Sequence, residues 1–134
     1  MDVKASYRGG GGAAGQILGR IVLKNVSADR CTIRGFVGLT YVRGPSQIQV
    51  GAGARKAPGT PVKTVLLRPG DRATSQISET EAGNYPKHRC KPSHVSGLLV
   101  SVPNASGSQF IEHNTTGCKN LHVHLLSHRA FKKS

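Results

Sequence analysis

Two histidines near the C-terminus have a spacing that could bind a metal ion. His122 and His124 alternate within the apolar stretch Leu121–Leu126, which is typical of a strand. Alternating residues of a strand share one face, so the two rings would lie about 7 Å apart and present two nitrogens to one ion. A third ligand would come from Glu112, His113 or His128. A half-exposed strand with both histidines facing solvent explains the same pattern and is the interpretation that we favour.

The glutamates at 79 and 81 alternate in the same way and could mimic the carboxylate pair of a glycosidase. Such pairs need one carboxyl group with a raised pKa, in a cleft flanked by aromatic side chains. The chain is only 4% aromatic and has no Trp, so we expect Glu79 and Glu81 to mark a solvated strand end. The sequence also has no G-x-S-x-G nucleophile elbow. We therefore expect no catalytic residue, no cofactor and no enzymatic activity, with a small metal-dependent enzyme on His122 and His124 as an alternative.

The charge of the chain points to polyanionic partners. Nineteen Lys and Arg stand against six Asp and Glu, a formal net charge of +13 on 134 residues. A field of this kind attracts nucleic acid, anionic lipid and anionic envelope polymers, although it also serves solubility alone. No run of five or six basic residues forms a nucleic-acid arm. The residues that we expect to contact a polyanion are Arg34, Arg43, Lys87, Arg89, Lys91, Arg129, Lys132 and Lys133.

Binding of nucleic acid would require aromatic side chains interleaved with basic ones on one face. Phe36 lies two residues from Arg34, and Tyr41 lies two residues from Arg43. Because the chain has so few aromatic residues to fill a core, packing of these rings in the interior is the favoured interpretation. A nucleic-acid-binding β domain remains the alternative function.

The elements that would position these residues are short strands. Helix periodicity is almost absent, and β-type runs alternate with Gly, Pro, Asn and Ser. The turn Arg68–Asp71 predicts a hairpin between Val62–Leu67 and Arg72–Ser78. About eight strands in one domain, residues 1–134, predict a two-layer antiparallel sandwich, with a barrel as the alternative and flexible ends at 1–2 and 128–134. The predicted strands are Val3–Tyr7, Ile17–Val26, Cys31–Val42 (bent at Gly35 or Gly38), Gln47–Val50, Val62–Leu67, Arg72–Ser78, Val95–Val102, Gln109–Glu112 and Leu121–Leu126.

The three cysteines bear on the compartment. None of them forms a C-x-x-C pair, which excludes zinc-ribbon and dithiol redox motifs. An odd count suggests one disulfide and one free thiol, and disulfides belong to oxidising compartments. Residues Met1–Gly12 do not have the features of a signal peptide. The residues alone therefore leave two alternatives, a cytosolic protein with free thiols or a mature segment of an exported one.

Four segments, taken in order, resemble a known family. They are Gly15–Ser27, Arg30–Phe36, Val65–Ala73 with its L-x-P-G-x-x-A pattern, and the stretch from Cys90 through Val102-Pro103 and Cys118 to Val123. Together they are similar to the domain-of-unknown-function family numbered 4232, found in secreted and lipid-anchored proteins of actinobacteria. The similarity covers roughly residues 2 to 127. Val37 departs from it, because the family usually has proline there.

The resemblance implies an immunoglobulin-like sandwich outside the cytoplasm, with a disulfide between Cys90 and Cys118 and no catalytic residues. Members usually carry another cysteine just before the first strand. This sequence has no cysteine there, so we expect Cys31 to be unpaired in this chain. We expect a non-enzymatic binding or structural module of the cell envelope, secreted or envelope-anchored. Its partner would be an anionic envelope polymer, an anionic lipid or another exported protein.

Overall fold

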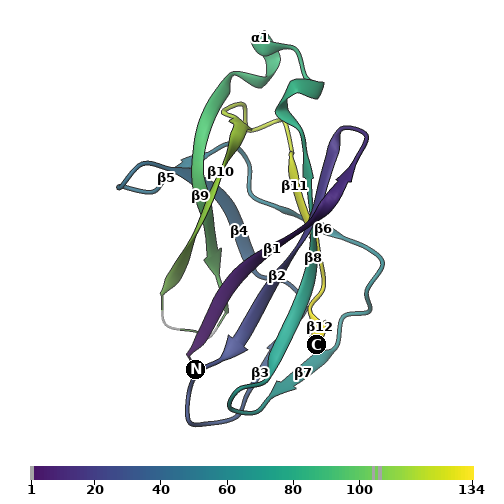
Figure 1. Ribbon diagram of the computed structural model, residues 1–134, viewed down its shortest axis with the longest axis vertical. Helices are drawn as coiled ribbons and strands as arrows, with labels where there is room; N and C mark the ends of the chain where they lie inside the picture. The colour runs from purple at the N-terminus through teal and green to yellow at the C-terminus, as the bar shows by residue number, and fades with distance from the viewer. Residues whose placement is uncertain (1, 104, 106) are drawn as a thin grey trace.

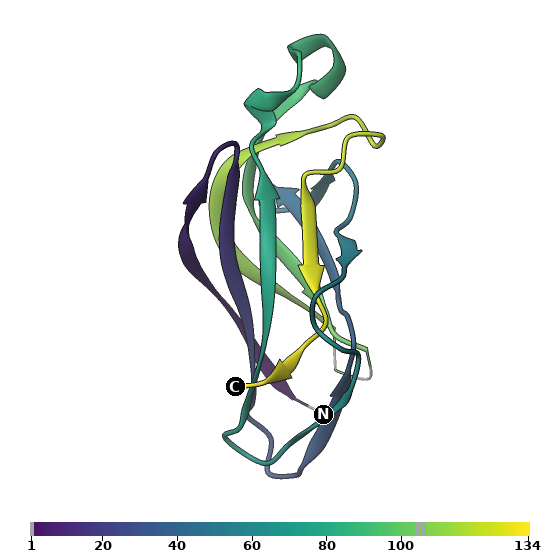
Figure 2. The ribbon, with the colours of Figure 1, turned by 90° about the vertical axis from the view of Figure 1, so that its right-hand side faces the viewer.

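The chain forms two packed layers of strands in the computed structural model, which describes residues 2–103, 105 and 107–134. Figure 2 shows the strands of the larger sheet side by side in the order β1-β2-β8-β11-β6, with β12 next to β8. All of its pairs are antiparallel except β11 with β6. These strands are β1 (Val3–Ala13), β2 (Gln16–Asn25), β6 (Arg55–Ala57), β8 (Arg72–Thr80), β11 (Leu126–Arg129) and β12 (Lys132–Lys133).

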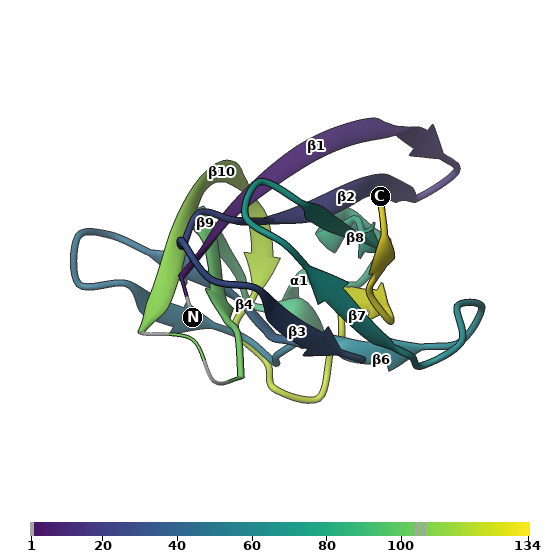
Figure 3. The ribbon, with the colours of Figure 1, turned by 90° about the horizontal axis from the view of Figure 1, so that it is seen from below.

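The second layer is a four-stranded antiparallel sheet in the order β10-β9-β4-β5, on the left of Figure 1. Its strands are β4 (Gly38–Arg43), β5 (Ile48–Val50), β9 (Pro92–Ser101) and β10 (Ser108–Cys118). A separate pair, β3 (Cys31–Arg34) with β7 (Thr64–Leu67), lies at one end of the molecule (Figures 1 and 3). Two short helices, η1 (Ala82–Asn84) and α1 (Lys87–Cys90), lie at the other end. The predicted all-β sandwich is confirmed.

The core lies between the two sheets and follows the period of two that strands impose. In β8 the burial alternates along the whole strand, with Ala73, Ser75, Ile77 and Glu79 facing inward. The C-terminal residues 128–134, which we expected to form a flexible end, contribute β12 and the largest fully buried side chain, that of Phe131. The backbone N–H of Phe131 donates to the Gly35 carbonyl at 2.8 Å. Met1, at the other predicted flexible end, lies outside the described residues.

The long strand predicted over residues 31–42 is broken where a bend was expected. Gly35 has a φ of 74°, a left-handed conformation that favours glycine, and the chain then passes from β3 into a different sheet at β4. The predicted hairpin of β7 with β8 is wrong. The turn between them does form, with Asp71 N–H donating to the Arg68 carbonyl, but β7 pairs with β3 while β8 pairs with β2. A tight turn fixes the direction of the chain and leaves the choice of partner strand to the packing.

No helix in the described part of the chain is long and apolar enough to cross a membrane.

Candidate functional site

The outer face of the larger sheet gathers basic side chains from six strands. Residues that oppose one another across a sheet point to the same face, and the register places Lys4 opposite Lys24, and Lys24 opposite Arg72. Arg8 lies opposite Arg20 in the same way. We call this set the basic face; its members are Lys4, Arg8, Arg20, Lys24, Arg55, Arg72, Arg129 and Lys132. All eight are exposed except the half-buried Lys24.

No carboxylate neutralises the basic face among the described residues. The outward positions of these six strands contain no Asp or Glu, and Glu79, the one acidic residue within them, faces inward. The described residues form two ion pairs, His113 with Glu79 and Lys133 with Asp71, and neither uses a member of the basic face. The sheet therefore carries a concentrated positive field on one side.

The structure divides the eight polyanion-contact residues that the sequence suggested. Arg129 and Lys132 belong to the basic face, whereas the amino group of Lys133 donates to Asp71 at 2.7 Å. Arg34 in β3 donates to the Thr64 hydroxyl. The remaining four lie elsewhere, Arg43 at the end of β4 and Lys87, Arg89 and Lys91 in and just after α1.

Six members of the basic face were not among the predicted contact residues, because they are scattered along the chain. The sequence signal that could have found them is their alternation with less polar residues within each strand. Lys4 in β1, and Arg20 and Lys24 in β2, stand between neighbours that are buried or half-buried, and Arg8 follows the half-buried Tyr7. That alternation shows that they face outward, but only the strand pairing brings them together.

The two aromatic residues that the sequence suggested as contacts for nucleic acid, Phe36 and Tyr41, lie in different environments. Tyr41 is 3% exposed and belongs to the core, so it offers no surface for a base. Phe36 is half-buried, and the Lys56 ammonium lies 5.4 Å from the centre of its ring. The described part of the chain thus shows no aromatic row interleaved with the basic face.

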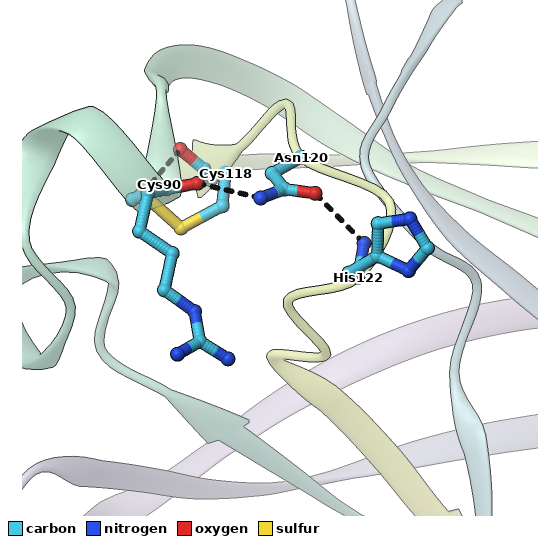
Figure 4. The surroundings of a disulfide bond; sticks show 6 residues. Cys90, Cys118, Asn120 and His122 are labelled. Atoms are coloured by element: carbon cyan, nitrogen blue, oxygen red, sulfur yellow. Dashed lines mark hydrogen bonds between the residues drawn. A yellow bond between two sulfur atoms is a disulfide. The ribbon is translucent and has the colours of Figure 1, made fainter.

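His122 and His124 do not lie on a strand, which corrects the prediction for residues 121–126. The stretch before Leu126 is a loop, and β11 begins only at that residue. Asn120 shapes this loop, because its side-chain oxygen accepts the His122 backbone N–H while its amide donates to the Arg89 carbonyl (Figure 4). Within the described residues no group of three or more His, Cys, Asp or Glu is arranged to hold a metal ion.

The other ligands suggested for that metal have different roles. The ring of His128 is buried, and its Nε2–H donates to the Val37 carbonyl at 3.1 Å. Burial lowers the pKa of His128, so the ring is neutral. His113 contacts Glu79, and Glu112 is exposed on β10.

Glu79 was expected at a solvated strand end and is instead 2% exposed in the core. Its position in β8 shares the inward phase of Ala73 and Ile77, and the carboxylate accepts three hydrogen bonds. One oxygen accepts from the Tyr41 hydroxyl at 2.6 Å and from His113 Nε2 at 2.7 Å. The other accepts from the Tyr7 hydroxyl at 3.0 Å. Glu79 therefore joins four strands drawn from both sheets.

Close packing brings Tyr7 to this carboxylate. Gly19 of β2 lies diagonally across from Tyr7, and a Cβ added there would stand 2.7 Å from the Tyr7 hydroxyl, so only glycine lets the ring cross β2. The Tyr7 and His113 rings are 4.5 Å apart at their centres. Burial, followed by the charge of Glu79, raises the pKa of Tyr7 to about 12 and moves that of Tyr41 upward as well.

Glu79 also lines a cavity of about 590 Å³, with Glu81, Tyr85 and Lys87 among the other lining residues. Burial raises the pKa of Glu79, but hydrogen bonds from His113, Tyr41 and Tyr7 and the His113 charge bring it below its ordinary value. A carboxylate held ionised in this way cannot donate a proton to a leaving group. Glu79 thus lacks the raised pKa that the general acid of a glycosidase needs.

The disulfide lies at the end of the sandwich that carries α1. Cys90 and Cys118 are joined with their Cα atoms 4.6 Å apart, and both side chains are buried (Figure 4). Lys119 N–H donates to the Lys91 carbonyl at 2.9 Å, which holds the two flanking segments together. A buried disulfide indicates an oxidising environment outside the cytoplasm.

Comparison with known proteins points to a family of unknown function. The model of the family described as "Domain of unknown function (DUF4232)" matches residues 1–131. The chain belongs to this family. No curated protein and no solved structure matches it. The disulfide that the DUF4232 resemblance implied, Cys90 with Cys118, is confirmed, and so is the unpaired Cys31, all three cysteines lying within the described residues.

We expect thiol titration of the unreduced protein in denaturant to give one thiol per chain, that of Cys31. Reduction before the titration serves as the control and should raise the value to three, because it opens the disulfide. A value of three without reduction would contradict the disulfide.

Proposed function

We propose that this chain is a non-enzymatic binding module that acts outside the cytoplasm, at the cell envelope, and holds a polyanion on its basic face. The observation that carries the proposal is the opposition of like charges across neighbouring strands. Lys4, Lys24 and Arg72 form one row, and Arg8 with Arg20 forms another. Like charges directly opposite one another destabilise a sheet, so a sequence that needed only solubility would gain by interspersing carboxylates.

The buried disulfide and membership of DUF4232 support the location of the proposed activity. That the chain derives from a secreted or lipid-anchored protein of an actinobacterium is part of the same proposal. The anion would be an envelope polymer, a lipid headgroup or an acidic surface of another exported protein, since each offers the carboxylate or phosphate groups that Arg and Lys bind.

Neutralising one row of the basic face should weaken binding far more than an equal loss of charge elsewhere. The variant Arg8→Gln/Arg20→Gln removes two adjacent cations, and Arg43→Gln/Arg89→Gln is the matched control off the basic face. At about 1 kcal/mol for each cation held at an anionic surface, the first variant should bind on the order of thirtyfold more weakly. The control variant should bind nearly as tightly as the wild-type chain.

The measurement is a binding isotherm at physiological salt against poly(glycerol phosphate), phosphatidylglycerol vesicles, duplex DNA and single-stranded RNA. Equal weakening by both variants would show that net charge alone acts and would contradict the proposal. Micromolar binding to duplex DNA, with indifference to the polymer and the vesicles, would favour the alternative of a nucleic-acid-binding domain.

A further inference from the structure

Two adjoining hollows cross the middle of the basic face. The first, of about 420 Å³, is lined by Arg20 of β2, Thr74 of β8 and Lys132 of β12. The second, of about 350 Å³, is lined by Ser78 of β8 and by Ser127 and Arg129 of β11. Leu18 and Gln76 line both, so the two hollows form one trough that runs across β2, β8 and β11.

We propose that this trough holds a linear phosphodiester polymer, which lies across the strands with its phosphates against Arg20, Lys132 and Arg129. The inference rests on the proposed function and names the partner within it. Cations line both hollows, Arg20 and Lys132 the first and Arg129 the second, and the planar fork of arginine matches two phosphate oxygens at once. The Ser127 hydroxyl in the second hollow offers a hydrogen bond to a phosphodiester backbone, whereas the Thr74 and Ser78 hydroxyls already bond to Ser134 and Gln16.

The shape of the sheet favours a flexible chain over a flat bilayer. Neighbouring strands are rotated by about 20–25°, which adds up across five strands to roughly a right angle. In Figure 1 β1 and β11 accordingly incline in opposite directions. A plane that meets the cations of β1 cannot also meet those of β11 and β6, whereas a flexible chain can follow the twist and enter a hollow.

The outward side chains of the described strands include no exposed large apolar residue to insert into a membrane and no aromatic residue to stack on a nucleic-acid base. Leu18 and Val22, the large apolar residues at outward positions of β2, are both half-buried and offer nothing to insert among lipids. The outward positions of the six strands contain no aromatic residue on which a base could stack. Recognition on this face is therefore recognition of a charged backbone.

The test compares Arg20→Gln and Arg129→Gln, one in each hollow of the trough, with Lys24→Gln, which lies on the basic face outside it. The probes are poly(glycerol phosphate), phosphatidylglycerol vesicles and polyglutamate. Each trough variant should bind the polymer about fivefold more weakly and lower the slope of log K against log salt by about 0.7. Lys24→Gln, whose half-buried side chain belongs to the basic face but lies outside the trough, should lower both by less than either trough variant. Circular dichroism should show all three variants folded.

Each alternative outcome overturns the inference in a distinguishable way. Vesicles bound as tightly as the polymer, with loss in only one of the two trough variants, would indicate a bilayer. Equal affinity for polyglutamate would show that phosphate is not recognised, and equal loss from Lys24→Gln would show that the trough has no special role. These three results leave the proposed function standing, whereas failure to bind any polyanion would overturn both.

Discussion

Replacing Glu79 by alanine is expected to cost on the order of 3 kcal/mol of unfolding free energy, because it removes the acceptor shared by one buried and two half-buried donors. The hydroxyls of Tyr7 and Tyr41 and the Nε2 of His113 all point at this one carboxylate, from three different strands. Its loss would loosen the contact between the two sheets as well as leave polar groups without partners.

Urea denaturation followed by far-UV circular dichroism measures this cost. Glu81→Ala is the matched control, since Glu81 is exposed just after β8 and no hydrogen bond of its side chain is lost. Its stability should stay within about 0.5 kcal/mol of the wild-type value. A Glu79→Ala chain as stable as the control would show that the buried network adds nothing to the fold.

The same carboxylate makes stability depend on acid. The pKa of Glu79 in the folded chain lies below its ordinary value of 4.5, so the unfolded chain binds a proton more readily. Its contribution is complete above pH 4.5 and is lost as the pH falls through the lower, folded pKa. Glu79→Gln should therefore show a shallower decline of stability in this acid range than the wild-type chain.

Asp71 contributes to that decline as well, because a hydrogen bond from Lys133 and one from the Arg68 backbone lower its pKa. The difference between the wild-type and Glu79→Gln slopes isolates the Glu79 contribution, since Asp71 is present in both. Parallel slopes in the two chains would contradict the assigned direction of the pKa shift.

Removing the disulfide is expected to cost about 3.5 kcal/mol in the chain-entropy model, given the 28-residue separation of Cys90 and Cys118. The bridge closes the segment that contains β9 and β10, which together form half of the second sheet. The unfolded chain gains more freedom without it than the folded chain does. Cys90→Ala/Cys118→Ala should therefore unfold at a much lower urea concentration.

Cys31→Ala is the matched control for this prediction, because Cys31 forms no disulfide in the described structure. Reductant should destabilise the wild-type chain by an amount similar to the double substitution and should leave the double variant unchanged. A wild-type chain whose urea midpoint does not respond to reductant would contradict a stabilising role for the bridge.

The alternation of buried and exposed residues along the strands indicates the direction of the basic side chains and of the buried carboxylate alike. The alternation of Lys4, Arg8, Arg20 and Lys24 with more buried residues already showed which way those side chains point. The same alternation indicates that Glu79 points inward, because Ala73, Ser75 and Ile77 precede it at the inward positions of β8. The expectation of a solvated strand end rests on composition alone, whereas the inward phase of β8 continues through Glu79 and places it in the core.

The sequence by itself determined the class of the fold, the positions of most strands and the break near Gly35. The spacing of hydrophobic residues and the residues that form turns are local signals, because each depends only on residues a few positions apart. They can therefore be recognised in the sequence alone. It also determined, through the family resemblance, that Cys90 and Cys118 pair and that Cys31 stays free.

Only the tertiary structure decided which strands are neighbours, and the candidate site depends on that choice. We expected β8 to pair with β7, but it pairs with β2. This pairing aligns Arg72 with Lys24 and Lys4. The C-terminal segment likewise joins β8 because Phe131 fills the core, and it thereby adds Arg129 and Lys132 to the basic face. Contacts between residues far apart in the chain depend on the packing of the whole core, which no local pattern encodes.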